Sequence, residues 1–318
     1  LPFVAFFFPM YGYTPFVYGE IPSVAFLLLS AWLIAECINA PKWWKYVCVG
    51  LSCGGTYIVR NNTVIMLLGI AIALIVRAVG PRSRSFVAVL ISMLAGVFLC
   101  KCGIDMLYRP YVPDDAEAMP AVLWITMGTN TTFADGPGWF DAYNIWTFED
   151  TDYDRDAAER IAYVDLEAFI ARCKSDPAFA FHFYSQKMNS QWNAPMYGAL
   201  AVNSETYGDR GRLAGEIYEG EFGRNIVKYL NIFQLFVYLS VIYLAIRGGA
   251  RGISEYILLI GVFGGFLFSL IWEAHTRYIF PYMMFLLPEA AIACGIMYKD
   301  MGRLLAMMRQ KGYKGEPE

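Results

Sequence analysis

Long runs of apolar residues, separated by short polar joints, constrain this chain more than any other feature. The runs are about 17–25 residues long, which is the length an α-helix needs to cross the hydrocarbon core of a bilayer. Hydrophobic residues make up 57% of the 318 residues and charged residues only 17%, which is too apolar for an ordinary soluble domain. The sequence therefore predicts an α-helical polytopic membrane protein.

The positions of the apolar runs predict about seven transmembrane helices. We expect them at about residues 20–38, 46–59, 63–79, 85–107, 225–246, 253–272 and 278–298. Residues 1–8 are also apolar and begin with a leucine inside the run, so we expect them to be the end of a truncated helix. The chain then divides into an N-terminal transmembrane part, an insert, a C-terminal transmembrane part and a basic tail, at residues 1–107, 108–224, 225–298 and 299–318.

The insert, residues 108–224, is rich in acidic residues, Asn, Gly and aromatic residues and has no run long enough to span a membrane. Apolar residues recur at helical spacing over 154–172, which predicts a helix there. The sequence Ser-Asp-Pro at 175–177 is typical of a helix start, with a capping side chain followed by proline in the first turn. We expect this second helix to run to about Gln191, and the insert to be mainly helical.

Lysine and arginine are distributed unevenly between alternate loops. One set of loops holds Lys42, Lys45, Arg77, Arg82, Arg84, Arg247, Arg251, Lys299, Arg303, Arg309, Lys311 and Lys314. The short loops of the other set hold only Arg60 and Arg277, and the long insert is exempt because large domains cross regardless of charge. The positive-inside rule therefore predicts a multi-pass protein of the cell membrane with an extracytoplasmic insert and a cytoplasmic C-terminus.

The segment Trp-Glu-Ala-His-Thr-Arg-Tyr-Ile-Phe-Pro at 272–281 places Glu273, His275 and Arg277 between two very apolar runs. Charge at the edge of a membrane is costly and usually faces a cavity, a partner or a substrate. Arg277 could bind phosphate oxygens, Glu273 could orient it or bind a sugar hydroxyl or a metal, and His275 could donate to phosphate or shuttle a proton. The alternative is an interfacial turn in which Arg277 reaches the lipid headgroups.

Other outer segments could contribute to the same site. Near the N-terminus, Tyr18 and other aromatic residues precede the carboxylate of Glu20, a combination suited to binding a sugar. The alternative is an interfacial aromatic belt, with Glu20 in a first helical turn where the helix dipole favours it. Arg60 departs from the positive-inside pattern, which favours an anion contact. Lys187 and Trp192, at the end of the second insert helix, could face the cavity or belong to an aromatic core.

The order of these outer segments resembles the C-type (GT-C) superfamily of integral-membrane glycosyltransferases, related to protein mannosyltransferases and often labelled glycosyltransferase family 39-like. A Gram-positive bacterial subgroup has an insert that begins with Pro-x-x-x-Trp-x-x-Met-Gly and continues with a Gly-rich loop, a helix and Lys-x-x-x-x-Trp, followed by a late Glu-x-x-x-Arg-Tyr-x-x-Pro turn. The matching residues here are Pro120, Trp124, Met127, Gly128, Gly136 to Trp139, Lys187, Trp192, Glu273, Arg277, Tyr278 and Pro281.

The resemblance implies transfer of a sugar from a polyprenyl-phosphate donor to a lipid, glycan or protein acceptor of the cell envelope, on the outer membrane face. Taken with the charges described above, it makes Arg277, Arg60 and His275 candidate donor phosphate-binding residues, although His275 departs from the family pattern. The candidate substrate-binding residues are Glu273, Glu20, Tyr18, Lys187 and Trp192. The family's catalytic acid lies in its first outer loop, a region that is absent here, so no residue of this chain is assigned to catalysis.

The family does not fix a cofactor, although some members use a divalent metal. The seven cysteines lack zinc-site spacing, which favours buried thiols over a metal site. No nucleic acid is expected as a partner. A flippase or exporter of lipid-linked saccharides remains the alternative function, although we find none of the internal symmetry typical of transporters.

Overall fold

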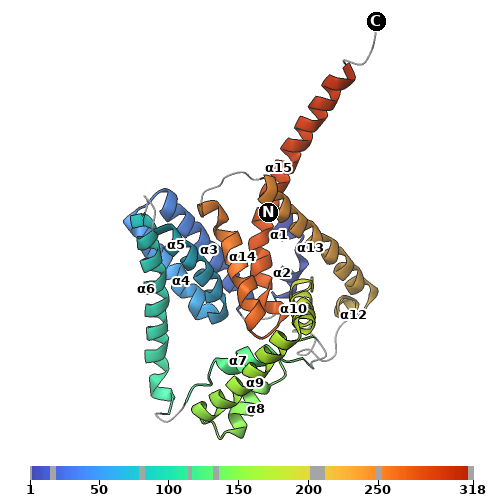
Figure 1. Cartoon of the computed structure of the whole chain (residues 1–318). Helices are drawn as coiled ribbons and strands as arrows, with labels where there is room; N and C mark the ends of the chain where they lie inside the picture. The colour runs from blue at the N-terminus through green and yellow to red at the C-terminus, as the bar shows by residue number, and fades with distance from the viewer. Residues whose placement is uncertain are drawn as a thin grey trace.

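In the computed structural model the chain is a helical membrane protein with a bundle of long helices, an insert at one end of the bundle, and a C-terminal helix that projects from the other end (Figure 1). The structure describes residues 2–14, 19–78, 83–113, 117–131, 136–200, 212–247 and 253–313. No strand occurs within these ranges, where a single bridge joins Trp139 to Ala274. Tyr18 lies outside them.

The N-terminal part forms six α-helices and two short 3₁₀ turns. They are α1 (Pro2–Ala5), α2 (Phe8–Gly12), α3 (Glu20–Asn39), α4 (Trp43–Val59), η1 (Asn61–Thr63), α5 (Val64–Ala78), α6 (Ser83–Tyr108) and η2 (Arg109–Tyr111). The single helix end expected over residues 1–8 is divided in two, because α1 ends at Ala5 and α2 begins at Phe8 with Pro9 in its first turn. The Phe7 ring at this break is buried against Phe280 and Tyr197.

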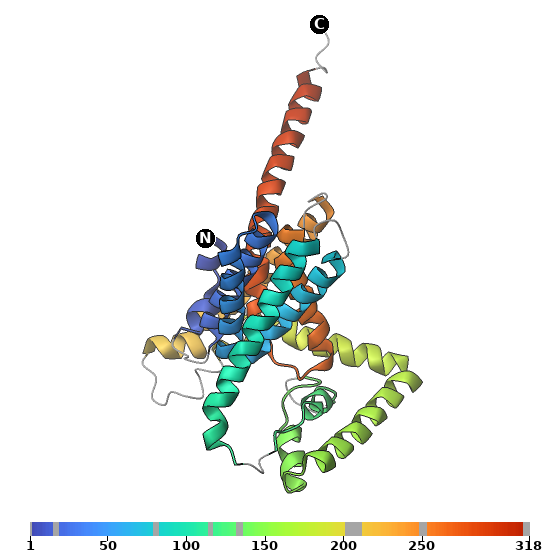
Figure 2. The same cartoon turned by 90° about the vertical axis from the view of Figure 1, so that its left-hand side faces the viewer.

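The described part of the insert consists of α7 (Val122–Met127), α8 (Tyr143–Asp150), α9 (Arg155–Ser175), α10 (Pro177–Trp192) and α12 (Arg212–Tyr218). Both predicted helices are confirmed as α9 and α10. Each starts at an aspartate whose side chain accepts a backbone N–H three residues on, Asp154 for α9 and Asp176 for α10, as helix caps do. Figure 2 shows α9 and α10 (yellow-green) meeting at an angle below the bundle.

The C-terminal part consists of α13 (Glu221–Arg247), α14 (Ile253–Ile271), η3 (Thr276–Tyr278) and α15 (Phe280–Tyr313). The predicted boundary between the last span and a separate tail at residue 299 is not a structural break, because α15 continues without interruption. Beyond this point Met301, Leu304 and Leu305 are exposed. Asp300, just before them, is held by Tyr243 and Arg247 of α13.

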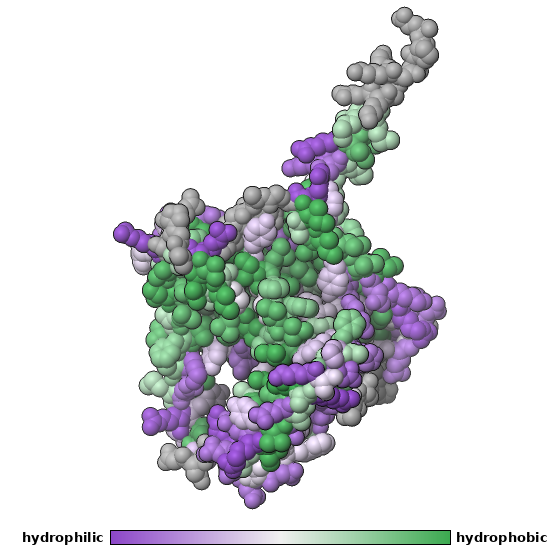
Figure 3. Space-filling model, in the orientation of Figure 1, coloured by the Kyte–Doolittle hydropathy of each residue, from purple (hydrophilic) through white to green (hydrophobic). Residues whose placement is uncertain are grey.

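Five helices of the described residues are long and apolar enough to cross a membrane: Glu20–Asn39, Asn61–Ala78, Arg84–Tyr111, Glu221–Arg247 and Phe280–Met308. The runs expected at 46–59 and 253–272 form the shorter helices α4 and α14. Within α14, Tyr256–Ile271 is an apolar helix shorter than the five candidate spans. A space-filling view shows an apolar band across this face of the bundle, with more polar surface at either end (Figure 3).

Helix directions place the alternate loops at opposite ends of the bundle. The start of α3, the η1 turn and the η3 turn lie together at the end that carries the insert, since Glu20 contacts Arg60 and Arg60 contacts Tyr278. At the other end α3 and α4 are joined by the ion pair of Glu36 with Lys45. The described turns at Glu20, Arg60 and Tyr278 thus lie at the opposite end from the basic junction of α3 with α4.

Small residues allow the closest helix contact in the bundle. Gly50 and Gly54 of α4 face Gly96 of α6, where a Cβ atom added to Gly96 would lie 2.0 Å from the Gly50 carbonyl oxygen. Close backbone approach through Gly-x-x-x-Gly spacing is a common way for membrane helices to associate. Within the described residues α15 is the most buried of the long apolar helices and α6 the least, so the core lies between α3 and α15.

Candidate anion-binding site

Two turns at the insert end of the bundle form the candidate site. The first, η1, joins α4 to α5 and begins after Arg60; the second, η3, joins α14 to α15 and includes Arg277 and Tyr278. The η3 turn is held locally, because Nδ1 of His275 accepts the backbone N–H of Arg277 at 3.3 Å and the His275 carbonyl accepts that of Tyr278 at 3.1 Å. Histidine here serves as the cap that starts a 3₁₀ turn.

The arginines of both turns lie against the ring of Tyr278. The Cζ atom of Arg60 and that of Arg277 are each 5.7 Å from the ring centroid, a distance at which a guanidinium is attracted to an aromatic face. Both side chains line one cavity of about 440 Å³, together with the end of α4 and Ile104 of α6. Figure 3 shows the surface hollowed between the bundle, α6 and the insert.

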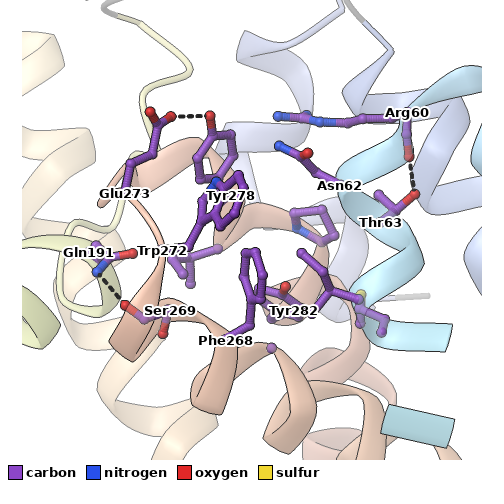
Figure 4. A pocket seen from close by; sticks show the side chains of 15 residues that line it. Arg60, Asn62, Thr63, Gln191, Phe268, Ser269, Trp272, Glu273, Tyr278 and Tyr282 are labelled. Carbon is purple, nitrogen blue, oxygen red and sulfur yellow. Dashed lines mark hydrogen bonds between the residues drawn. The ribbon is translucent and has the colours of Figure 1, made fainter. Parts of the chain in front are cut away.

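A second, narrower cavity of about 30 Å³ lies deeper, between α5 and α14, with room for about one or two water molecules. The two helices touch where a Cβ added to Gly264 would lie 3.0 Å from the Cα of Gly69. Beyond this crossing, toward η1 and η3, Phe268, Ser269 and Trp272 of the α14 end line the cavity (Figure 4). Arg60, Asn62 and Tyr278 line both cavities, so the two spaces adjoin.

Glu20 is the counter-ion of Arg60. Its Oε1 atom lies 2.6 Å from Nη1 of Arg60, and the two side chains are 1% and 8% exposed. Glu20 is the first residue of α3 and follows Gly19, whose φ of 93° starts the helix sharply. Glu20 therefore lies in the first turn of α3, as the sequence suggested, and also forms an ion pair. Arg60 lines both cavities, whereas Glu20 lines neither and fixes the position of Arg60.

Glu273 and Tyr278 form the polar link between the cavities. Oε1 of the nearly buried Glu273 accepts the Tyr278 hydroxyl (Figure 4). Burial raises the pKa of the Glu273 carboxyl, against the lowering effects of the Tyr278 hydrogen bond and of Arg277 and Lys187. Burial also raises the pKa of Tyr278, and the negative charge of Glu273 acts in the same direction. The phenol therefore stays protonated and remains a hydrogen-bond donor.

His275 is a neutral group in this site. Burial, followed by the charges of Arg277 and Arg60, lowers its pKa to about 3. Because Nδ1 accepts a backbone N–H, the proton of the neutral ring is on Nε2. The ring lies 5.3 Å from that of Trp139 in the insert. A pKa this low does not suit the proton-shuttle role suggested by the sequence, whereas a neutral N–H donor to phosphate stays compatible with the geometry.

Lys187 lies behind the site and lines neither cavity. Its ammonium is fully buried and donates to three backbone carbonyls: Gly128 at 2.6 Å, Trp272 at 2.7 Å and Leu270 at 3.2 Å. Burial lowers the pKa of Lys187 to about 7, although the charge of Glu273 raises it. The sequence suggested that Lys187 contacts substrate directly. In this structure its N–H donors are instead used by three backbone carbonyls of the protein.

Trp192 supports the wall of the inner cavity and does not line it. Its ring stacks on Tyr282 at 5.7 Å, and its Nε1 donates to Ser269 Oγ at 3.2 Å. Both of those residues line the cavity. Gln191 next to it does line the cavity, and its buried Oε1 has no hydrogen-bond partner within the described ranges.

Several lining residues carried no signal in the sequence. Phe268, Ser269 and Tyr282 belong to runs that predict membrane spans, and only the packing of α14 and α15 with α5 turns them toward a cavity. The part of the chain that the structure describes contains no group of three or more His, Cys, Asp or Glu residues placed to hold a metal ion. Comparisons with known protein families, curated proteins and solved structures find no match to this chain.

Proposed function

We propose that this chain belongs to an integral-membrane glycosyltransferase of the C-type class, which moves a sugar from a polyprenyl-phosphate donor to a lipid or cell-envelope acceptor. One observation carries the proposal: Arg60 and Arg277, from turns far apart in sequence, line the same cavity with Tyr278 between them. A phosphate placed in this cavity would meet two guanidinium groups, which bind phosphate oxygens with paired hydrogen bonds.

The chemistry of transfer accounts for the position of these cations. An acceptor hydroxyl oxygen attacks the anomeric carbon, the bond from that carbon to the phosphate oxygen breaks, and the phosphate leaves with the electron pair. Positive charge fixed beside the leaving oxygen stabilises this developing charge. The hydroxyl proton passes to a general base. In the family that this chain resembles, that base lies in the first outer loop, and we assign it to no residue of this chain.

Our proposed topology has about seven spans, with the insert on the outer side and the C-terminus in the cytoplasm. It is supported by the two sets of loops at opposite ends of the bundle and by the concentration of basic residues in one set. The outer set then holds Arg60, whose counter-ion is Glu20, and Arg277, a cation that the positive-inside rule disfavours on that side and that an anionic substrate would account for. The insert beside the cavity would bind the acceptor.

Sugar transfer in proteoliposomes of the full-length protein tests the proposal. The donors would be radiolabelled polyprenyl-phosphate hexoses, and the acceptors would be extracted envelope lipids and glycans. We expect Arg277→Ala to lower transfer by about a hundredfold or more, the scale for loss of one charge-stabilising donor, with unchanged membrane insertion. Arg109→Ala is the matched control, since Arg109 is exposed and lines neither cavity.

Two results would overturn the proposed transferase function. One is wild-type turnover by Arg277→Ala. The other is movement of the labelled donor across the bilayer with no new glycosidic bond, which would identify the protein as a flippase or exporter of lipid-linked saccharides.

A further inference from the structure

The terminal nitrogen of Lys187 donates to backbone carbonyls at the C-terminal ends of two helices. Gly128 is the C-terminal cap of α7 in the insert, and Leu270 and Trp272 lie at the C-terminal end of α14 in the bundle. The last carbonyls of a helix have no partner inside the helix, and a lysine near a C-terminus can satisfy them. Here one fully buried side chain from a third helix, α10, serves carbonyls of both.

The backbone around Lys187 is packed so closely that Gly128 and Gly138 leave no room for a Cβ atom. A Cβ atom on Gly128 would lie 2.7 Å from the Trp272 carbonyl oxygen. A Cβ on Gly138, whose φ is +77°, would lie 2.5 Å from the Gly128 carbonyl oxygen and 2.9 Å from Cε of Lys187. The Gly138 carbonyl in turn accepts the N–H of Ala274 at 2.6 Å. Two loops of the insert and the end of α14 therefore meet at this lysine.

We infer that Lys187 is a positioning residue, which locks the insert onto the end of α14 and so fixes the 273–277 turn, where Glu273 lines the inner cavity and Arg277 lines the larger cavity beside Arg60. This inference deepens the proposed function, because it makes the position of the insert part of the phosphate site. Two hydrogen bonds connect the insert to this turn. Lys187 donates to the carbonyl of Trp272, which directly precedes Glu273. Ala274, which lies between Glu273 and His275 in the sequence, donates its N–H to the carbonyl of Gly138.

The three carbonyls require a side chain that is long, flexible and able to donate several hydrogen bonds. The terminal nitrogen of lysine meets this requirement, with three N–H donors as an ammonium and two as a neutral amine. Methionine is about the same length but offers no donor, so Lys187→Met would leave three carbonyls without their partner. The loss is local to the contact of α7, α10 and α14.

Hydrogen–deuterium exchange of the protein in lipid nanodiscs tests the lock without any ligand. We expect Lys187→Met to speed amide exchange about tenfold or more in residues 128–139 and 272–279 and to leave α13 unchanged. Lys174→Met, at an exposed position on α9, should exchange like the wild type. Unchanged exchange in the two segments, or equal acceleration throughout the bundle, would overturn the inference.

A second variant decides the matter if Lys187→Met fails to fold. Gly138→Ala keeps the lysine and displaces it, so the same two segments should exchange faster; wild-type exchange in this variant would overturn the inference. Binding of polyprenyl phosphate, measured on the same samples, separates the two proposals. If Arg277→Ala leaves binding unchanged, the proposed function fails, while the exchange results still judge the role of Lys187.

Discussion

Oε1 of Glu20 and Nη1 of Arg60 lie 2.6 Å apart in an ion pair whose two side chains are almost fully buried. Removing one member of such a pair leaves an uncompensated charge, at a cost of about 3–5 kcal/mol. We therefore expect Glu20→Ala to lower the free energy of unfolding by about 3 kcal/mol, measured by denaturant titration in detergent micelles.

The Glu36–Lys45 pair at the opposite end of α3 provides the control. The side chain of Glu36 is 41% exposed and that of Lys45 is 9% exposed, so only one of the two charges is buried and Glu36→Ala should cost less than Glu20→Ala. The double variant of Glu20 and Arg60 to alanine should be more stable than the sum of the single effects implies, because the pair is removed together. Additive effects would mean that the two charges do not interact.

His275 gives the protein a specific sensitivity to acid. Its pKa is about 3 in the folded protein and about 6.5 when unfolded. Between these values the unfolded state binds a proton that the folded state does not, so stability falls as the pH falls from about 6.5 toward 3. For this partly exposed ring we expect a loss on the order of 1 kcal/mol at pH 5.

Thermal unfolding between pH 7 and pH 5 checks this expectation. His275→Gln, which is neutral at both pH values, should unfold with a smaller shift in Tm than the wild type. His182→Gln, at the other histidine of the chain, which is exposed, should keep the wild-type shift. An identical shift in all three proteins would show that His275 does not titrate as the structure implies.

Lys187 contributes in a higher pH window, with the same sign as His275. Its pKa is about 7 when folded and 10.5 as a free side chain, so between these values the unfolded state again binds the extra proton. Stability contributed by this group therefore rises as the pH increases from 7 to about 10. The difference in Tm between the wild type and Lys187→Met should change with pH over this range, while Lys174→Met should differ from wild type by a constant amount.

The α4–α6 contact predicts unequal effects for two glycines of one helix. At Gly96 an added Cβ would lie 2.0 Å from the Gly50 carbonyl oxygen, whereas at Gly103 nothing lies within 4 Å. We expect Gly96→Ala to destabilise the protein by about 1–3 kcal/mol, the usual cost of overpacking. Gly103→Ala should be neutral or slightly stabilising, since alanine favours a helix. Equal unfolding curves would contradict the contact.

Local patterns in the sequence were sufficient for the long helices, but not for the break between α1 and α2 or for the short helices α7 and α8. The Ser-Asp-Pro signal at 175–177 located the start of α10, where Asp176 is the cap, because a cap depends on residues three positions apart. The charges at Arg60 and Arg277 were recognised as one site from their positions relative to the membrane. By contrast, the Glu20–Arg60 pair and the three carbonyls around Lys187 depend on which helices are neighbours. Periodicity in one sequence carries no such information.

Equilibrium binding of polyprenyl phosphate to the protein in nanodiscs tests the central claim most directly, because it requires neither a sugar nor an acceptor. We expect Arg277→Ala to weaken binding by at least about tenfold, in line with about 1.5–3 kcal/mol for a hydrogen bond to a charged group. Arg277→Lys should retain part of the affinity, and Arg109→Ala all of it. Wild-type affinity in Arg277→Ala, with the protein folded and inserted, would contradict the assignment of this cavity to a lipid-linked phosphate.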